Sequence, residues 1–157
     1  MTRTDESALI ALSLEYADAV RARDEERWAA TWTEDAQWLL DDDRAVAGRD
    51  AIVAMWATSL AKYRTVVQMY LACTYDIAND ATDDTAVDTA GDTASGRCEL
   101  QELSVLADGS AKILAGHYAD TYRRTADGWR FTSRRLVRYY HGPPDLSAGF
   151  PADGPTG

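Results

Sequence analysis

The best-placed polar pair in the sequence is Tyr118 and Asp120, which lie two residues apart in a segment with the alternating pattern of a β-strand. Residues two apart on a strand point to the same side, so these side chains would share a face with Leu114. A carboxylate among aromatic side chains has a raised pKa, because burial disfavours its charged form, and it could act as a base near neutral pH. The alternative is a structural ion pair between Asp120 and a nearby arginine: Arg123, Arg134 or Arg135.

Few other residues could carry chemistry. His117 and His141 are the only histidines, and both lie far from any carboxylate at metal-ligand spacing, so we predict no metal site. His117 has opposite parity to the Tyr118 pair and should point to the other face of the sheet. Glu99 and Gln101, on the preceding strand, are predicted to be exposed polar residues. The sequence holds no glycine-rich phosphate loop, and we predict no cofactor.

Three helices are expected in the first part of the chain. Apolar residues at helical spacing predict the first helix over residues 5–22. Asp24 would cap the second helix, which would carry Trp28 and Trp32 on one face. The third helix would follow a short strand over residues 36–40 and a glycine turn.

Antiparallel strands are expected in the second half. Asp-Gly dipeptides at 108–109 and 127–128 are typical of tight hairpin turns. The strands are expected over residues 65–75, 97–106, 111–124 and 129–140. In the first of these, period-two spacing would place an apolar or aromatic set on one face: Val67, Met69, Leu71, Cys73 and Tyr75.

This order of elements predicts an α+β fold, in which three N-terminal helices pack on a strongly curved, mostly antiparallel sheet and enclose a pocket. A single domain would cover residues 1–141, and a Pro/Gly-rich tail would follow over 142–157. Residues 78–96 are rich in Asp, Thr and Ala, and we predict a solvated loop there rather than a cation site.

The composition limits the partners and the compartment. The 157 residues carry a formal net charge of -10, which would repel nucleic acids and anionic membranes. The polar residues 2–6 and the lack of a long apolar run predict neither a secretory leader nor a membrane span. Cys73 and Cys98 belong to no motif, so we expect two reduced thiols in a cytoplasmic protein.

Two long stretches resemble the SnoaL-like branch of the NTF2-like superfamily. They are YADAVRARDEERWAATWTEDAQW at 16–38 and GHYADTYRRTADGWRFTSRRLVRYY at 116–140. The resemblance implies a cone-shaped fold with an internal pocket for a hydrophobic ligand, and commonly a homodimer formed through the open sheet face. It says little about the reaction, because this fold hosts dehydratases, isomerases, cyclases, epoxide hydrolases and non-catalytic subunits.

The best-matching enzymes of this branch are scytalone and bile acid 7α-dehydratases and γ-hexachlorocyclohexane dehydrochlorinase, which use an Asp/His dyad. The histidine, on the strand after the third helix, abstracts a proton, and the aspartate near the end of the first helix orients it. Matching on Trp38 and Gly48, the aspartate position falls on Arg21 and the histidine position on Met69. Neither a guanidinium nor a thioether can accept that proton, so the dyad mechanism does not transfer.

Other pocket positions are retained. The resemblance places Arg134 at a pocket arginine. Trp129 and Phe131 share parity with Arg135, so Arg134 would point inward only if this strand bulges or if that face lines the cavity. The resemblance also implies four pocket-wall residues: Tyr16, Trp38, Leu114 and Tyr118.

The sequence therefore predicts a cofactor-independent enzyme that eliminates, isomerises or cyclises an apolar polycyclic or polyketide-like substrate. Asp120 and Tyr118 would act with Arg21 or Arg134 in acid/base and oxyanion roles, as related polyketide cyclases use an aspartate on a late strand. Arg21 could equally complement the dipole of its helix end. Tyr16, Trp38, Met69 and Leu114 would bind the substrate. The alternative is a non-catalytic ligand-binding or structural subunit.

Overall fold

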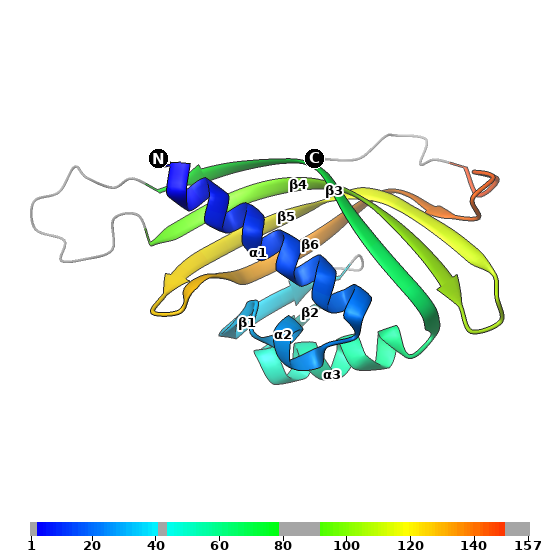
Figure 1. Ribbon diagram of the computed structural model, residues 1–157, viewed down its shortest axis with the longest axis horizontal. Helices are drawn as coiled ribbons and strands as arrows, with labels where there is room; N and C mark the ends of the chain where they lie inside the picture. The colour runs from blue at the N-terminus through cyan, green and yellow to red at the C-terminus, as the bar shows by residue number, and fades with distance from the viewer. Residues whose placement is uncertain (1–2, 41–43, 79–91, 150–157) are drawn as a thin grey trace, which may run out of the picture.

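The computed structural model describes residues 3–40, 44–78 and 92–149. Within these ranges the chain forms three helices and one six-stranded sheet, which is the predicted α+β fold (Figure 1). The helices are α1 (Arg3–Ala22), α2 (Glu25–Ala29) and α3 (Arg49–Leu60). The strands are β1 (Trp32–Leu39), β2 (Ala45–Ala47), β3 (Tyr63–Ile77), β4 (Thr93–Leu106), β5 (Ala111–Thr125) and β6 (Gly128–Gly142).

The sheet is mixed, curved and open, with the order β2-β1-β6-β5-β4-β3. Strands β3 to β6 pair antiparallel in chain order, and β1 lies parallel to β6. The two predicted hairpin turns are present, and Gly109 and Gly128 take positive φ angles of 88° and 104° there. Most of the predicted acidic loop, residues 79–91, lies outside the described residues.

The helices cover one face of the sheet. α1 crosses its concave side and contacts β3 and β6, while α3 packs beside β1 (Figure 1). The second helix is shorter than predicted, because it ends at Ala29 and Trp32 already begins β1. The Thr31 hydroxyl donates to the Trp28 carbonyl at 2.7 Å, and the Thr31 carbonyl accepts from Phe131 of β6 at 2.9 Å. Pairing with the sheet therefore ends the helix before Trp32.

A β-bulge in β3 overturns the predicted apolar face of that strand. The pairing with β4 shifts between Tyr70 and Ala72, so Leu71 is an extra residue and its surface is 69% exposed. One extra residue inverts the alternation of side chains. Met69 consequently points to the outer face of the sheet, whereas Gln68 and Tyr70 point toward α1.

A second bulge, in β6, turns Arg134 inward. Phe131 pairs with Tyr122 and Ser133 pairs with Thr121, so Thr132 is the extra residue. The Thr121 hydroxyl lies 2.7 Å from the hydroxyls of both Thr132 and Ser133. The bulge on which an inward Arg134 depended is therefore present.

The expectation of free thiols is wrong. Cys73 of β3 and Cys98 of β4 are direct partners across the two strands and form a disulfide. Neither residue belongs to a motif, and only the register of the strands brings them together. The disulfide removes one ground for the cytoplasmic expectation. None of the described helices is long and apolar enough to cross a membrane.

The aromatic stretch at 16–38 forms the centre of the core. The Trp28 ring is fully buried and stacks on Trp56 with 4.7 Å between ring centres. Two more rings pack on Trp28: Tyr16 of α1, with 5.3 Å between ring centres, and Trp32 of β1, with 5.6 Å between ring centres. These contacts fix both the first helix and the first strand against the inner face of the sheet.

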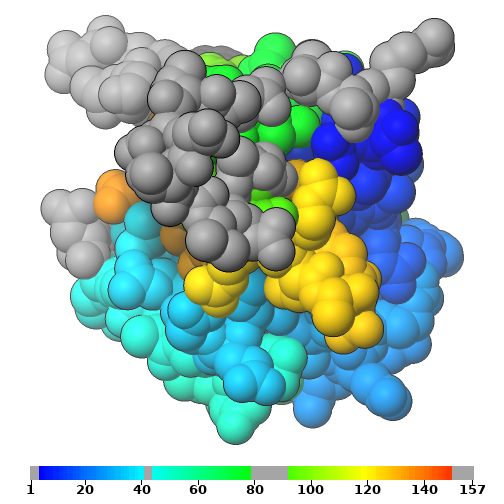
Figure 2. Space-filling model, turned by 90° about the vertical axis from the view of Figure 1, so that its left-hand side faces the viewer, coloured from blue at the N-terminus to red at the C-terminus, as the bar shows by residue number. Residues whose placement is uncertain are grey.

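Ion pairs tie β5 to α1 and β1 at one end of the molecule. Arg124 donates to Asp5 of α1, and Arg123 donates to Asp35 of β1, each at 2.5 Å. Figure 2 looks onto this end and shows the β5–β6 turn (yellow) between α1 (dark blue) and the β1 to α3 region (cyan). These two pairs join the sheet to the first helix and the first strand at this end.

Candidate active site

An ion pair at the centre of the inner sheet face joins Asp120 of β5 to Arg134 of β6. Arg134 Nε donates to Asp120 Oδ1 at 2.9 Å, and Nη2 donates to Oδ2 at 2.8 Å. Neither side chain has exposed surface, and the Tyr122 hydroxyl also donates to Oδ2 at 3.1 Å. Of the three arginines considered from the sequence, Arg134 is the partner of Asp120.

Aromatic rings enclose the Arg134 guanidinium. Its Cζ atom lies 3.8 Å from the ring centre of Tyr118, 4.0 Å from that of Phe131 and 4.3 Å from that of Tyr16. Nη1 donates to the Tyr70 hydroxyl at 3.2 Å. Ring faces and a bidentate carboxylate together offset the free energy of burying this cation. Because water is excluded, its field acts on neighbouring groups with little screening.

Burial and charge act in opposite directions on the pKa values of this cluster. Burial raises the pKa of Asp120, and the Arg134 guanidinium opposes that rise. Burial lowers the pKa of Arg134, but Asp120 and Tyr70 raise it well above its ordinary value, so the guanidinium stays charged. Burial also raises the pKa values of Tyr16, Tyr70 and Tyr118, which are therefore neutral hydrogen-bond donors.

A second inward-facing carboxylate, on Glu102 of β4, was missed by the sequence reasoning. Gln68 Nε2 donates to Glu102 Oε2 at 2.9 Å and to the Tyr118 hydroxyl at 3.4 Å. Burial raises the pKa of Glu102, and the Gln68 hydrogen bond opposes the rise. Glu102 forms no ion pair within the described ranges, unlike Asp120. It is therefore the carboxylate better able to gain and lose a proton.

Gln68 also carries an unsatisfied acceptor. Its Oε1 atom is buried and has no hydrogen-bond partner among the residues that the structure describes. A buried carbonyl without a donor is unfavourable, and such groups are often completed by a ligand or water. Gln68, Glu102 and Tyr118 thus form a polar corner beside the Arg134 cluster with bonding capacity to spare.

Strand parity explains why Glu102 was missed. From the sequence, Glu99 and Gln101 were considered on this strand. Both point to the outer face, where Glu99 pairs with Arg97. Cys98 and Leu100 are both buried on the inner face, and Glu102 continues that alternation. An acidic residue in phase with two apolar ones was the available signal.

The structure separates several other residues from the predicted site. Arg21 was predicted as an oxyanion group, but its side chain is 60% exposed and pairs with Asp18 on the outside of α1. Met69 was predicted to bind substrate, and the β3 bulge turns it to the outer face. Both assignments fail because these positions point away from the interior.

The predicted wall residues lie on the inner side. Tyr16 covers Arg134, and Leu114 packs with Tyr118 and Leu100 beyond it. Trp38 is half-buried and contacts Trp28 with 5.9 Å between ring centres, so it belongs to the tryptophan cluster. The wall prediction thus brings together Tyr16, Tyr118 and Leu114, and leaves Trp38 with the core.

The Asp/His dyad of the related enzymes is also absent from the positions next to Met69. The inward residues that flank Met69 on β3 are Gln68 and Tyr70, and neither is a histidine. His117 points to the outer face, as its parity predicted, and its Nδ1 lies 2.7 Å from the Tyr139 hydroxyl. His141 lies beside Arg138, with 3.3 Å between Nδ1 and Nη1. A search of the described residues finds no cluster of side chains able to hold a metal ion.

A family model for the SnoaL-like domain matches residues 1–135. The chain belongs to this family. No curated protein matches the sequence. As a SnoaL-like domain it shares its fold with enzymes of known structure whose sequences are less than a quarter identical to its own.

Three of these solved structures cover nearly the whole chain. A hexachlorocyclohexane dehydrochlorinase (LinA type 2) has 19% identity and a TM-score of 0.75, covering 98% of this chain and 95% of its own. A putative scytalone dehydratase from Novosphingobium aromaticivorans has 18% identity and a TM-score of 0.77, covering 95% and 93%. A putative aromatic ring hydroxylase from the same organism has 23% identity and a TM-score of 0.75, covering 90% and 94%. At these identities the likeness establishes the fold alone.

Proposed function

We propose that this SnoaL-like protein is a cofactor-independent enzyme that abstracts a proton from an apolar polycyclic or polyketide-like substrate, in an elimination, isomerisation or cyclisation. The observation that carries the proposal is that two inward-facing carboxylates have different partners. Asp120 is bound by a cation, whereas Glu102 accepts a hydrogen bond from a neutral amide. Carboxylates held in unlike surroundings take unlike roles in acid/base chemistry.

Glu102 is the proposed base. Its raised pKa makes it a stronger proton acceptor than an exposed carboxylate, and Gln68 fixes one of its oxygens. The proton on the substrate carbon passes to a Glu102 oxygen, and the electron pair of the broken C–H bond moves into the substrate. The neutral acid that results suits this buried position better than a charge would.

Arg134 and the tyrosines are proposed to stabilise the developing negative charge. The Tyr70 oxygen accepts from Arg134 Nη1, which leaves its own proton free for a substrate oxygen. Tyr118 lies over the guanidinium and shares the Gln68 amide with Glu102. Asp120 acts through Arg134 by holding the guanidinium in place, so it positions the cation and does not itself take the proton.

A general probe for a base in an apolar site tests this assignment without knowledge of the natural substrate. We expect wild-type protein to accelerate the ring-opening elimination of 5-nitrobenzisoxazole, followed by absorbance. Glu102→Gln should lower kcat/KM by at least about 100-fold, the lower range for loss of a positioned base. Glu99→Gln, which changes an outward carboxylate on the same strand, should leave the rate unchanged.

Measuring ligand binding as well as the elimination rate distinguishes an enzyme from a non-catalytic ligand-binding protein. If 2-naphthol quenches tryptophan fluorescence but neither the wild type nor the Glu102 variant accelerates the elimination, the protein is a ligand-binding module. The lack of the family dyad favours that second function. Equal acceleration by the wild type and by Glu102→Gln would reject Glu102 as the base while leaving another enzyme activity open.

We further propose that two copies associate through the part of the open sheet face that lies nearer the β4–β5 turn, following the resemblance to the family. Leu71 and Leu103 are exposed on that face by 69% and 42%. Sedimentation velocity of the wild type and of Leu71→Lys tests this. A dimer that Leu71→Lys disrupts supports the proposal, and a monomeric wild type contradicts it.

A further inference from the structure

A row of side chains with two arginines crosses the outer face of the sheet. Strand register pairs Arg97 of β4 with Ala119 of β5, and Ala119 with Arg135 of β6. Thr74 of β3 and Leu39 of β1 extend the row at its two ends. Neighbouring strands lie about 4.8 Å apart, so the Arg97 and Arg135 backbones are roughly 10 Å apart, with an exposed alanine between them.

The next row on the same face carries hydroxyls. Ser95, Thr121 and Ser133 are consecutive register partners on β4, β5 and β6, and Asp76 of β3 precedes them. Residues two apart on a strand share a face, so these hydroxyls lie beside the arginine row. The two arginines on either side of an alanine, with the hydroxyls beside them, form a surface rich in hydrogen-bond donors. The net charge of the protein as a whole is -10.

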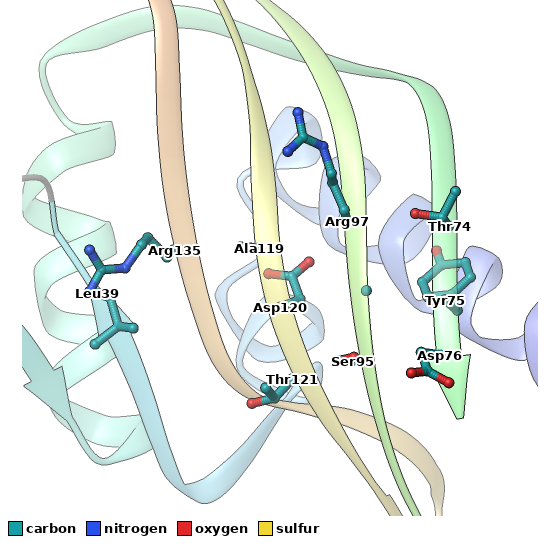
Figure 3. A pocket seen from close by; sticks show the side chains of 11 residues that line it. Leu39, Thr74, Tyr75, Asp76, Ser95, Arg97, Ala119, Asp120, Thr121 and Arg135 are labelled. Carbon is teal, nitrogen blue, oxygen red and sulfur yellow. The ribbon is translucent and has the colours of Figure 1, made fainter. Parts of the chain in front are cut away.

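A groove of about 540 Å³ follows these two rows (Figure 3). Both arginines line it, with Ala119 and Gly96 between them and Leu39 at one end. Its volume lies in the range of small-molecule sites. The groove opens on the side of the sheet opposite α1. Tyr75 and Asp120 also line it, whereas Glu102 and Tyr118 do not.

Arg97 is held in place by its neighbours. Arg97 Nε donates to Glu99 Oε1 at 2.9 Å, and Arg97 Nη2 donates to the Tyr139 hydroxyl at 2.6 Å. The Tyr139 oxygen also lies 2.7 Å from His117 Nδ1. These hydrogen bonds of Arg97 use Nε and Nη2, and a planar guanidinium with a fixed edge presents its remaining N–H groups in one direction. Glu99 offsets part of the charge, so the attraction for an anion is modest.

We infer that this outer groove binds a small organic anion, whose carboxylate or phosphate lies above Ala119 between Arg97 and Arg135. Guanidinium groups bind the oxygens of either anion through charge-assisted hydrogen bonds. The Ser95 and Thr121 hydroxyls contact the polar part of the ligand, and its apolar body covers Ala119 and Leu39.

Three probes of similar size test which chemical group of a ligand the groove binds. Benzoate, phenyl phosphate and neutral benzamide are each titrated into the full-length protein and followed by amide chemical shifts in NMR. Shifts should centre on Arg97, Ala119 and Thr121 for the two anions and be absent for benzamide. Tighter binding of benzoate assigns a carboxylate ligand, and tighter binding of phenyl phosphate assigns a phosphate ligand.

Variants distinguish the groove from the general surface. Arg97→Gln and Arg135→Gln should each weaken anion binding about tenfold or more, as expected for a charge-assisted hydrogen bond. Ala119→Leu keeps both charges and fills the floor of the groove, so it should abolish binding without changing net charge. Arg64→Gln removes an exposed arginine elsewhere on β3 and should have no effect.

Three results would overturn the inference. Benzamide could bind as well as benzoate, Arg64→Gln could weaken binding as much as Arg97→Gln, or Ala119→Leu could bind the anions normally. Glu102→Gln should still bind them with wild-type affinity. This last variant makes failure of the outer groove distinguishable from failure of the proposed active site.

Discussion

Two carboxylates on one sheet face behave differently because their immediate partners differ. Asp120 is enclosed with Arg134, and its charge is balanced by two direct hydrogen bonds. Glu102 faces an amide and carries no opposite charge beside it. The first arrangement stores a permanent dipole inside the protein, and the second leaves a group that exchanges protons.

Asp120→Asn should destabilise the protein strongly, because it leaves the Arg134 cation buried without a counter-charge. Removing one partner of a buried ion pair costs about 3–5 kcal/mol of unfolding free energy. Equilibrium urea unfolding measures the loss. Asp35→Asn, which breaks the exposed pair with Arg123, should cost no more than about 1 kcal/mol. A loss for Asp120→Asn as small as that of the control would contradict the role of the pair.

Glu102 should make the wild type less stable as pH rises. Its folded pKa is raised above the unfolded value of about 4.3, so the folded state binds the proton more tightly. Stability is therefore lost as pH rises from the unfolded pKa through the folded one, and Glu102→Gln avoids this loss. Urea unfolding between pH 4 and 8 measures this. As pH rises, the unfolding free energy of Glu102→Gln should increase relative to that of the wild type, until the pH exceeds both the unfolded and the folded pKa of Glu102. Arg97 and Tyr139 lower the Glu99 pKa despite its burial, so its charged form stabilises the fold above the unfolded pKa of about 4.3. The difference between Glu99→Gln and the wild type should therefore stay constant across the neutral range and shrink only as pH falls below about 4.

At the scale of elements, the sequence predicted the helices and hairpins well and the strand faces poorly. The Asp-Gly turns and the helical spacing are local signals, and they located α1, α3 and the last two hairpins. The faces of β3 depend on Leu71, an extra residue that only pairing with β4 reveals. The Cys73–Cys98 disulfide was missed for the same reason, since it depends on which residues lie opposite across two strands. Glu102 differs, because its phase with Cys98 and Leu100 was a signal within β4 itself.

The β6 bulge is the element that puts Arg134 and Phe131 on the same face. Deleting Thr132 leaves Phe131 and Arg134 two residues apart, so simple alternation keeps both side chains on the inner face. The buried ring and the ion pair are both retained, so the deletion should cost less than the roughly 3 kcal/mol expected when either is lost. Urea unfolding measures the loss, and near-ultraviolet circular dichroism should keep the wild-type signal of the buried aromatic residues. Thr132→Ala keeps the extra residue and should remain within about 1 kcal/mol of wild type.

For the whole molecule, β3 is an edge strand that also supports α1. It pairs on one side only, with β4, and α1 crosses it to reach the inner face (Figure 1). The disulfide between Cys73 and Cys98 fixes that edge just beyond the bulge, with Tyr75 Oη 3.4 Å from Cys98 Sγ. The disulfide therefore ties the edge strand that α1 crosses to the neighbouring strand β4.

Reduction of this disulfide should lower the stability of the whole domain. The bond closes a loop with a sequence separation of 25 residues, for which loss of the cross-link costs about 3 kcal/mol through the entropy of the unfolded chain. Urea unfolding with and without dithiothreitol measures this. The double variant Cys73→Ser/Cys98→Ser should have the reduced stability under both conditions. Because the link acts mainly on the unfolded state, the elimination rate of 5-nitrobenzisoxazole at 25 °C should survive reduction. Wild-type stability unchanged by dithiothreitol, with free thiols confirmed by mass spectrometry after alkylation, would show that the fold does not depend on the bond.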